Sequence, residues 1–459
     1  MKIPRIIIGA TSSGSGKTLI AIALIKALIM GGKKVSAFKT GPDYIDPLFH
    51  KKILGVPSRN LDLFFSDEQQ VKSIFCGGSS GDISVIEGVM GFYDGLSSAT
   101  DTASTYHMAK TLKAPVVLVV DTKGMANSVL ALIKGFVSMD RKKTIKAVIL
   151  NNTSKNVYET LKPEIEKRFG ITALGYFPKQ KDIAIQSRYL GLLLPDEIND
   201  IQKMAEKAAL ELCKTVDIKK IISIADKAPD LSFKKEKAFW LFKNEPYPEG
   251  GKVKIAVARD KAFCFYYEDN LKLIEYYGGE LVEFSPLEDS LLPQGVCGLV
   301  LGGGYPELFA EALEKNEGLR RQILLKIKEG LPCVSECGGF MYLHDSVTVQ
   351  DGKKYRMAGA VKGDAFFAGK LVRFGYVSFT EKNNFFTGGK PVRGHEFHYF
   401  DSSSNGSDVR AEKPVSKKCW DCVHVSETEW AGFPHLYYPS NPEFARNFVE
   451  KCQRYKVEK

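Results

Sequence analysis

The stretch Ile6-Ile7-Ile8-Gly9-Ala10-Thr11-Ser12-Ser13-Gly14-Ser15-Gly16-Lys17-Thr18 decides the fold of the first part of this chain. It has the order of a strand, a glycine-rich turn, a lysine, a hydroxyl residue and an apolar helix over 19–30. Backbone N–H groups of such a turn converge on phosphate oxygens, and the helix N-terminus adds positive potential. The usual pattern has glycine at position 11, where this chain has threonine, and such a turn can also be only a tight connection. We predict nucleotide phosphate binding by Gly14, Ser15, Gly16, Lys17 and Thr18, with Lys17 reaching the β- and γ-phosphates.

The length and composition limit the class of protein. At 459 residues the chain exceeds one typical domain, and 44% hydrophobic with 26% charged residues is typical of a globular protein. No apolar run is long enough to span a bilayer, and the first residues do not resemble a signal peptide. Nine irregularly spaced cysteines fit a reduced compartment better than a disulfide framework. We expect a cytoplasmic protein of two or three domains without a membrane partner.

The net charge of +10 has three possible explanations. A nucleic acid partner is one, but the basic residues are spread along the chain and no recognition motif accompanies them. A small polyanionic substrate held together with ATP is the second. The third is a generally lysine-rich surface. Charge alone does not choose among them, and we predict no nucleic acid partner.

The order of strands and helices predicts the fold class. In the first half, β-rich runs at 35–39, 83–87, 116–121 and 147–151 alternate with helix-length segments. This alternation is typical of a doubly wound, mostly parallel α/β sheet, whose ligands gather at the carboxyl ends of the strands.

The amino-acid composition changes between about residues 223 and 251, and this segment separates the first α/β series from a second one. The segment is first charged and then rich in proline and glycine. Afterwards a second α/β series has strands at 253–258, 279–284, 298–301 and 333–336. We predict an ATP-binding domain over 1–222, a linker over 223–251 and a second α/β domain over 252–445.

Three carboxylates follow strands of the first half and are candidates for magnesium binding. Glu87 closes one strand, Asp43 lies in the loop after the second strand, and Asp121 ends a third. Mg²⁺ favours one or two carboxylates together with phosphate oxygens. A carboxylate at this position can also simply cap the next turn. Asn151 and Asn152 follow another strand, where their amides could contact an adenine edge or form an ordinary turn.

The second half contains a candidate nucleophile, Cys337. It lies in a tight strand-to-helix turn followed by two glycines, the geometry that exposes a nucleophile. The N–H groups of Gly302, Gly303 and Gly304, at the end of another strand, could stabilise an oxyanion. A thiol nucleophile needs a base, and the late histidines are His395, His398, His424 and His435. Alone, a buried cysteine is usually inert packing, but this setting favours a thiol nucleophile.

Taken together, these stretches resemble the cobyrinate/cobyric acid glutamine amidotransferase family. The stretch Gly41-Pro42-Asp43-Tyr44-Ile45-Asp46-Pro47 and the stretch Gly394-His395-Glu396-Phe397-His398-Tyr399 carry the resemblance most specifically, whereas many families share the P-loop. The resemblance extends nearly from end to end, through the segments 14–18, 41–47, 87–95, 187–192, 258–267, 302–308, 336–343, 394–399 and 431–436.

This resemblance implies a fused pair of domains. The N-terminal P-loop ATPase domain would be an amidoligase similar to dethiobiotin synthetase, and the C-terminal domain a glutaminase similar to class I glutamine amidotransferases. It implies that Thr18, Asp43 and Glu87 hold Mg²⁺ beside ATP. It also implies that Cys337 is the nucleophile and His435 its activating histidine.

Two features of the implied sites stay open. The class I pattern has a glutamate two residues after its histidine, where this chain has Tyr437. Glu396 or a backbone carbonyl could orient His435 instead. For the substrate, Tyr44, Asp46 and Arg188 are candidates because they lie in family-specific stretches, and each of them could equally be structural.

The implied activity is amidation of the a and c carboxylates of cobyrinate, a polycarboxylated tetrapyrrole of cobalamin biosynthesis, with glutamine and ATP through acyl phosphates. Hydrogenobyrinate and nickel-sirohydrochlorin are alternative substrates for the same chemistry. CTP synthase shares the domain order but lacks the stretch 394–399. A partitioning-type ATPase switch is a remote alternative, because such proteins have an extra lysine where this chain has Ser12 and have no glutaminase half.

Overall fold

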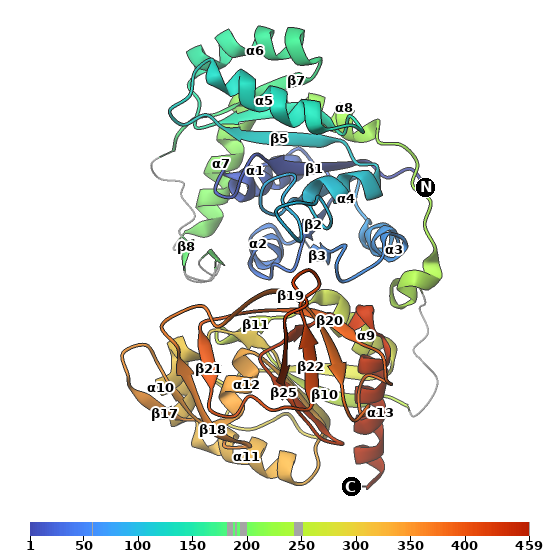
Figure 1. Ribbon diagram of the computed structural model, residues 1–459, viewed down its shortest axis with the longest axis vertical. Helices are drawn as coiled ribbons and strands as arrows, with labels where there is room; N and C mark the ends of the chain where they lie inside the picture. Colours follow the sequence, from blue (N-terminus) through green and yellow to red (C-terminus); the bar gives the residue numbers. More distant parts are fainter. Residues whose placement is uncertain (57, 181–186, 189–190, 193–199, 243–250, 459) are drawn as a thin grey trace. The chain divides into compact units, whose positions relative to one another are not determined.

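The computed structural model describes residues 1–56, 58–180, 187–188, 191–192, 200–242 and 251–458. The chain divides into two compact units, Met1–Phe242 and Lys243–Lys459 (Figure 1). Both units have α/β architecture, as the sequence predicts.

The first unit is built on a seven-stranded parallel sheet in the order β3-β2-β4-β1-β5-β6-β7. The central strands are almost continuous runs of buried β-branched residues because both faces of the sheet are covered. This sheet confirms the predicted doubly wound parallel fold. Its strands are β1 (Arg5–Ala10), β2 (Val35–Thr40), β3 (Ser58–Leu61), β4 (Ile83–Glu87), β5 (Val116–Asp121), β6 (Ile145–Asn151) and β7 (Thr172–Phe177).

Helices follow most of these strands. Helix α1, which follows the P-loop, is buried along most of its length and contacts both α2 and α7. The elements of this unit are α1 (Lys17–Met30), α2 (Ile45–Leu54), α3 (Glu68–Gly78), α4 (Thr105–Leu112), α5 (Ser128–Met139), α6 (Lys155–Phe169), the short pair β8 (Ser187–Arg188) and β9 (Gly191–Leu192), α7 (Ile201–Thr215), α8 (Ile218–Asp226) and the 3-10 helix η2 (Lys235–Leu241).

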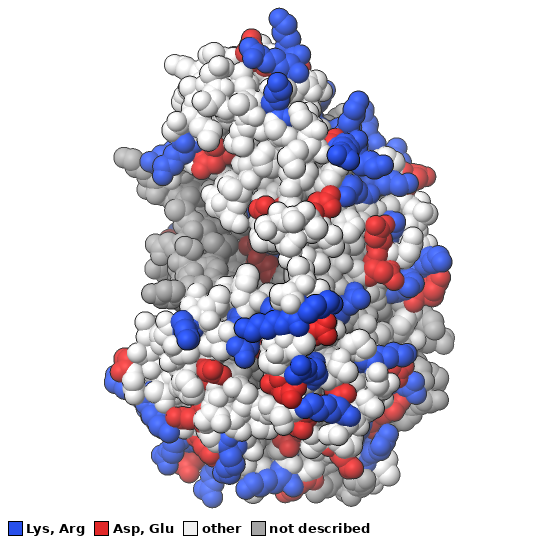
Figure 2. Space-filling view, viewed as in Figure 1, with Lys and Arg blue, Asp and Glu red and all other residues white. Residues whose placement is uncertain are grey.

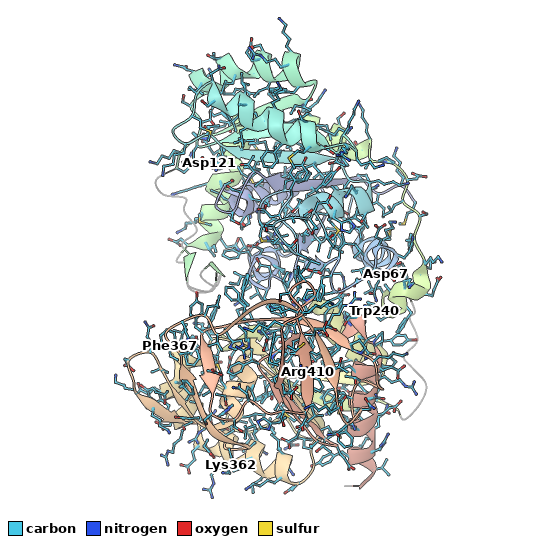
Figure 3. All side chains as sticks on the ribbon, viewed as in Figure 1. Asp67, Asp121, Trp240, Lys362, Phe367 and Arg410 are labelled. Atoms are coloured by element: carbon cyan, nitrogen blue, oxygen red, sulfur yellow. The ribbon has the colours of Figure 1, made fainter. Side chains whose placement is uncertain are left out.

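The segment predicted as a linker contains ordered structure. The end of α8 and all of η2 belong to the first compact unit, which therefore extends past the predicted boundary at residue 222. The hydroxyl of Ser73 donates to the carbonyl of Lys234 over 2.6 Å, and Lys237 Nζ lies 2.9 Å from Asp67 Oδ2. Figure 3 labels Asp67 and Trp240, which mark the place where η2 meets α3. The rest of the predicted linker, 243–250, lies outside the described residues.

The second unit has a central six-stranded sheet in the order β12-β10-β13-β15-β25-β24. Its strands pair in parallel except for β24, which runs antiparallel to β25. The strands are β10 (Val253–Ala258), β12 (Gly279–Phe284), β13 (Val296–Leu301), β15 (Cys333–Glu336), β24 (His424–Val425) and β25 (Glu429–Gly432). The four strands predicted from the sequence are all present in it.

Three further sheets, which the sequence analysis missed, complete this unit. The five-stranded sheet β23-β22-β19-β20-β26 matters most, because it carries three of the four late histidines, His395, His398 and His435. Its strands are β19 (Arg373–Glu381), β20 (Val392–His398), β22 (Val409–Glu412), β23 (Cys419–Cys422) and β26 (His435–Leu436). The others are the pair β11 (Phe263–Phe265) and β14 (Gly303–Gly304), and a sheet of β16 (His344–Thr348), β17 (Lys354–Arg356), β18 (Val361–Phe367) and β21 (Phe400–Ser402).

Helices flank the strands of this unit. They are α9 (Glu268–Tyr276), η3 (Pro306–Phe309), α10 (Ala310–Lys315), α11 (Glu317–Lys328), α12 (Gly338–Leu343), η4 (Tyr438–Ser440) and α13 (Glu443–Glu458). Helix α13 continues past the predicted domain end at residue 445, because it packs on α9, β10 and β13.

Two surface properties bear on the class of protein. Within the part of the chain that the structure describes, no helix has the length and apolar character needed to cross a bilayer. Figure 2 shows Lys and Arg side chains spread over the visible face among Asp and Glu side chains.

Candidate functional site

The P-loop joins β1 to α1 at the carboxyl edge of the parallel sheet. Gly14 and Gly16 have positive φ values of 77° and 86°, which non-glycine residues rarely adopt. Gly16 is the N-cap of α1, so the helix begins at Lys17 with free backbone N–H groups in its first turn. Lys17 Nζ donates to the carbonyl of Met90 over 3.1 Å. The local geometry is that of a phosphate-binding nest.

Asn151 braces this loop from β6. Its Nδ2 atom donates to the carbonyl of Ser15 over 2.9 Å, and a Cβ added to Gly16 would lie 2.2 Å from the same nitrogen. The Nδ2 atom of Asn151 is thus directed at the P-loop, and its predicted adenine contact stays a prediction. Asn152 has φ 56° and donates to Asp121 Oδ1 over 2.9 Å, so its adenine role stays a prediction.

A buried lysine that the sequence analysis missed organises the carboxylates. Lys39 is the penultimate residue of β2, forms an ion pair with Asp46 and lies 3.0 Å from Glu87 Oε1 and 3.9 Å from Asp43 Oδ2. Thr18 Oγ1 donates to the same Glu87 oxygen over 2.6 Å. Thr18, Asp43 and Glu87, predicted as magnesium ligands, are therefore brought to one place.

The charged groups of this cluster shift one another's pKa values. Burial opposes ionisation of Glu87, but Lys39 and hydrogen bonds from His50 and Thr18 hold its pKa below the usual range. Burial, together with Asp43 and Glu87, raises the pKa of Asp46. Burial and the nearby Lys39 lower the pKa of Lys17 to about 8. The cluster is rich in negative charge and suited to a divalent cation.

The donors fit Mg²⁺ better than a metal held by protein alone. Thr18, Asp43 and Glu87 offer one hydroxyl and two carboxylates, which are hard oxygen ligands. Among the described residues, no group of three or more His, Cys, Asp or Glu side chains is arranged as a metal site. Mg²⁺ usually takes its remaining ligands from phosphate and water, so this incomplete set is compatible with a cation that arrives with ATP.

The other predicted residues of this unit have different surroundings. Asp43 accepts from the N–H of Ile45 over 2.8 Å at the start of α2, next to Tyr44, which is buried. Asp46 is buried and forms an ion pair with Lys39. This structural role differs from the predicted role of Asp46 in substrate binding. Asp121 accepts from the N–H of Lys123 over 3.0 Å, so it caps a turn (labelled in Figure 3). The side chain of Arg188, in β8, lies outside the described residues.

Cys337 occupies a sharp elbow between β15 and α12. Its φ of 48° and ψ of −102° are unusual for a side-chain-bearing residue, and its N–H donates to the carbonyl of Gly432 over 2.9 Å. The N–H of Gly339 donates to the carbonyl of Gly302 over 2.9 Å. A Cβ on Gly339 would lie 2.1 Å from the carbonyl oxygen of Leu301, so glycine allows the elbow to press against the end of β13.

The three glycines after β13 lie beside this elbow but are not equivalent. A Cβ on Gly338 would lie 3.1 Å from the nitrogen of Gly304, and one on Gly303 would lie 2.4 Å from His435 Cε1. The N–H of Gly302 donates to the hydroxyl of Tyr266 over 2.9 Å. This bond differs from the prediction that Gly302 stabilises an oxyanion. Gly303 and Gly304 remain candidates.

His435 lies in the short strand β26 and faces a second histidine. Its ring stacks on that of His395 with centroids 4.9 Å apart and planes inclined by 15°. The Nδ1 atom of His395 lies 3.2 Å from the hydroxyl of Tyr267. The structure thus brings Gly303 and two of the four candidate histidines together.

Burial makes this site neutral. Burial, with a smaller effect of Glu307, raises the pKa of the Cys337 thiol. Burial and the neighbouring His395 and His398 lower the pKa of His435 well below its ordinary value. Burial also lowers the pKa of His395 to about 3. A neutral imidazole can accept a proton, as a general base must.

The remaining candidates are arranged around this centre. Glu396 Oε1 lies 3.6 Å from His398 Nε2, and the hydroxyl of Tyr437 donates to Asp269 Oδ2 over 3.4 Å. His424 is hydrogen-bonded to the carbonyl of Ser404 over 2.8 Å, on β24. Glu396 thus contacts His398, and its role in orienting His435 stays a prediction.

Comparison with known proteins agrees with this division of the chain. Residues 6–190 match the CobQ/CobB/MinD/ParA nucleotide binding domain, and residues 254–432 match the CobB/CobQ-like glutamine amidotransferase domain. Cobyrinate a,c-diamide synthase of Picrophilus torridus is 40% identical over 98% of this chain and 99% of its own length. The proteins of the same name from Caldanaerobacter subterraneus subsp. tengcongensis and Clostridium tetani are both 38% identical, over 98% and 97% of this chain and 98% and 99% of their own lengths. The chain belongs to the cobyrinate a,c-diamide synthase family and is a glutamine-dependent amidotransferase ligase with a nucleotide-binding domain.

Proposed function

We propose that this chain amidates the a and c carboxylates of cobyrinate, using glutamine as the nitrogen source and ATP to activate each carboxylate. The observation that carries the proposal is the presence, in one chain, of a P-loop beside a Lys39–Glu87 charge cluster and of a Cys337 elbow in the unit where Gly303 packs against His435. The names of the relatives supply the substrate, and their coverage of almost the whole chain supports the transfer.

The first unit would activate the carboxylate. A substrate carboxylate oxygen attacks the γ-phosphorus of ATP, ADP leaves, and an acyl phosphate forms. Activation is needed because ammonia does not displace an oxide or hydroxide leaving group from a carboxylate, whereas phosphate leaves readily. Lys17, with the P-loop N–H groups, would neutralise charge on the transferred phosphoryl group. Thr18, Asp43 and Glu87 would hold Mg²⁺, which supplies Lewis-acid neutralisation of the phosphate oxygens.

The second unit would supply ammonia. The thiol proton of Cys337 passes to His435 as the sulfur attacks the glutamine amide carbon. The tetrahedral oxyanion would be stabilised by the N–H groups of Gly303 or Gly304. Ammonia leaves with the proton from His435, and water then hydrolyses the thioester to glutamate. The ammonia attacks the acyl phosphate, phosphate leaves, and an amide forms. A second round on another carboxylate gives the diamide.

The test is product mass with a panel of substrates. Purified chain would be incubated with Mg-ATP and glutamine and, in separate reactions, cobyrinate, hydrogenobyrinate or nickel-sirohydrochlorin. We expect cobyrinate to gain two amides in successive steps. Diamide formation only with one of the other two would keep the chemistry and replace the substrate. Glutamine hydrolysis without a mass change in any of the three would contradict the proposed substrate class.

A further inference from the structure

The strand that carries His435 is short and needs support on both edges. Strand β26 has only two residues, and it pairs with β20 through the registers Gly394↔Leu436 and His395↔His435. The other edge of β26 presents the backbone N–H and C=O of Leu436. Burying these groups without hydrogen-bond partners would be costly. Leu436 and His435 are both buried, so the partners must come from the protein interior.

Two side chains bind the second edge. Asn270 of α9, which is 6% exposed, donates from Nδ2 to the carbonyl of Leu436 over 2.8 Å. Its Oδ1 accepts from the N–H of Tyr438 over 2.8 Å. One side-chain amide therefore bridges the residues on either side of Tyr437, in the manner of a neighbouring strand.

Glu336, at the end of β15, binds the same edge. Its carboxylate accepts from the backbone N–H of Leu436, and its Oε1 accepts from the hydroxyl of Tyr438 over 3.1 Å. Glu336 is 6% exposed and immediately precedes Cys337. The same end of β15 therefore presents the candidate nucleophile and contacts the residue that follows the candidate base.

The electrostatics agree with a hydrogen-bonding role. Burial raises the pKa of Glu336 to about 8, although the donors Tyr438 and Leu436 oppose this shift. At neutral pH the side chain is largely protonated and still accepts both hydrogen bonds through its lone pairs. A glutamine at this position would offer a similar shape and a carbonyl acceptor.

We propose that Glu336 and Asn270 are positioning residues, a side-chain clamp that fixes β26 and thereby holds His435 in register with Cys337. The clamp occupies the role that the class I pattern gives to a glutamate at position 437, where this chain has tyrosine. It acts through the backbone of Leu436 and not on the imidazole. The inference rests on the proposed role of Cys337 and His435 in glutamine hydrolysis.

The test compares Glu336→Ala with Glu336→Gln in the full chain. For Glu336→Ala we expect kcat for glutamate release to fall by about 10²-fold, because a misplacement of about 1 Å has this effect on catalysis. The KM for glutamine should change little, and amidation with ammonia should persist. Glu336→Gln should keep kcat within about threefold of that of the unchanged chain, because the glutamine carbonyl can accept the hydrogen bonds that the clamp needs.

A matched control separates the clamp from a general loss of packing. Glu381 is also a buried glutamate of this unit, and it accepts from the N–H groups of Phe386 and Thr387 over 3.0 and 2.9 Å. Glu381→Ala should leave glutamate release unchanged. Intrinsic tryptophan fluorescence, to which the buried Trp430 contributes, checks that each variant is folded. If Glu336→Ala does not fold, Tyr438→Phe removes a single hydrogen bond and should lower kcat by about fivefold.

The outcomes are distinguishable. A folded Glu336→Ala chain with unchanged kcat, or a Glu336→Gln chain as impaired as Glu336→Ala, overturns the clamp. An equal loss in Glu381→Ala overturns it as well. Equal glutamate release by the unchanged chain and by Cys337→Ala would contradict the proposed function of the unit. The clamp would then be overturned too, because it rests on that function.

Discussion

The two candidate sites differ in how they hold charge. In the first unit, Lys39 is buried among Asp46, Glu87 and Asp43, and the site depends on ion pairs at the carboxyl ends of parallel strands. In the second unit, burial raises the pKa of Cys337 and lowers that of His435, so the site is neutral. The first arrangement suits phosphate and a divalent cation, which bring charge with them. The second suits a proton transfer that separates charge only during the reaction. We therefore expect a substitution in one of the two sites to affect the step assigned to that site and to leave the chemistry of the other site intact.

The largest effect is expected from Lys39→Met. Removing the ammonium leaves Glu87 and Asp46 buried without their shared cation, which costs about 3–5 kcal/mol when a buried pair is broken. Amidation with either glutamine or ammonia should fall by about 10³-fold, since the phosphate site loses its electrostatic order. Thermal unfolding and product mass measure the two effects. Retained amidation with ammonia would show that the charge cluster is not needed for activation.

The next effect, from His435→Ala, should be confined to the other half-reaction. Loss of a general base lowers glutamate release by about 10²–10³-fold, whereas amidation with ammonia should persist. His424→Ala is the control, because His424 bonds to Ser404 outside the Cys337 elbow and should leave glutamate release unchanged. Equal loss in the two variants would contradict the assignment of the base.

A smaller effect tests the geometry of the P-loop. Gly16→Ala places a methyl group 2.2 Å from Asn151 Nδ2 at a φ of 86°. We expect about a tenfold rise in the KM for ATP, equivalent to roughly 1.4 kcal/mol. Gly14→Ala has a similar φ of 77° with nothing within 4 Å of the added carbon, so it isolates backbone strain. If both variants bind ATP equally, the contact with Asn151 has no part in the effect.

The smallest effect on activity comes from Glu336→Gln, which instead changes the pH dependence of stability. Burial raises the folded-state pKa of Glu336 to about 8 from an ordinary value of 4.5, so the folded chain binds more protons between these pH values. The free energy of unfolding of this unit should therefore fall as pH rises from about 4.5 to 8, by a few kcal/mol at most. Denaturant unfolding across this range should show a flatter curve for Glu336→Gln. Parallel curves would mean that Glu336 does not titrate in this way.

The sequence predicts what depends on local order and misses what depends on distant contacts. The glycine-lysine-threonine turn predicts β1, the P-loop and α1, and the glycines after Cys337 predict its elbow, because each feature is contiguous in the chain. Lys39 carried a signal, a lysine ending an apolar strand before Gly41, but its partner Glu87 is 48 residues away. Asn270 and Glu336 bind Leu436 from 166 and 100 positions away, so no local pattern reveals them. The pairings of β18 with β21 and of β20 with β26 were missed for the same reason, since each joins strands more than 30 residues apart.

The most direct test of the division between the two units is Cys337→Ala, assayed with cobyrinate and Mg-ATP. Product mass would be followed with glutamine and, separately, with ammonium salt as the nitrogen source. We predict that this variant forms no amide from glutamine and forms the diamide from ammonia at the rate of the unchanged chain. Loss of amidation from both sources, in a variant that remains folded, would contradict the account. Undiminished amidation from glutamine would exclude Cys337 as the nucleophile.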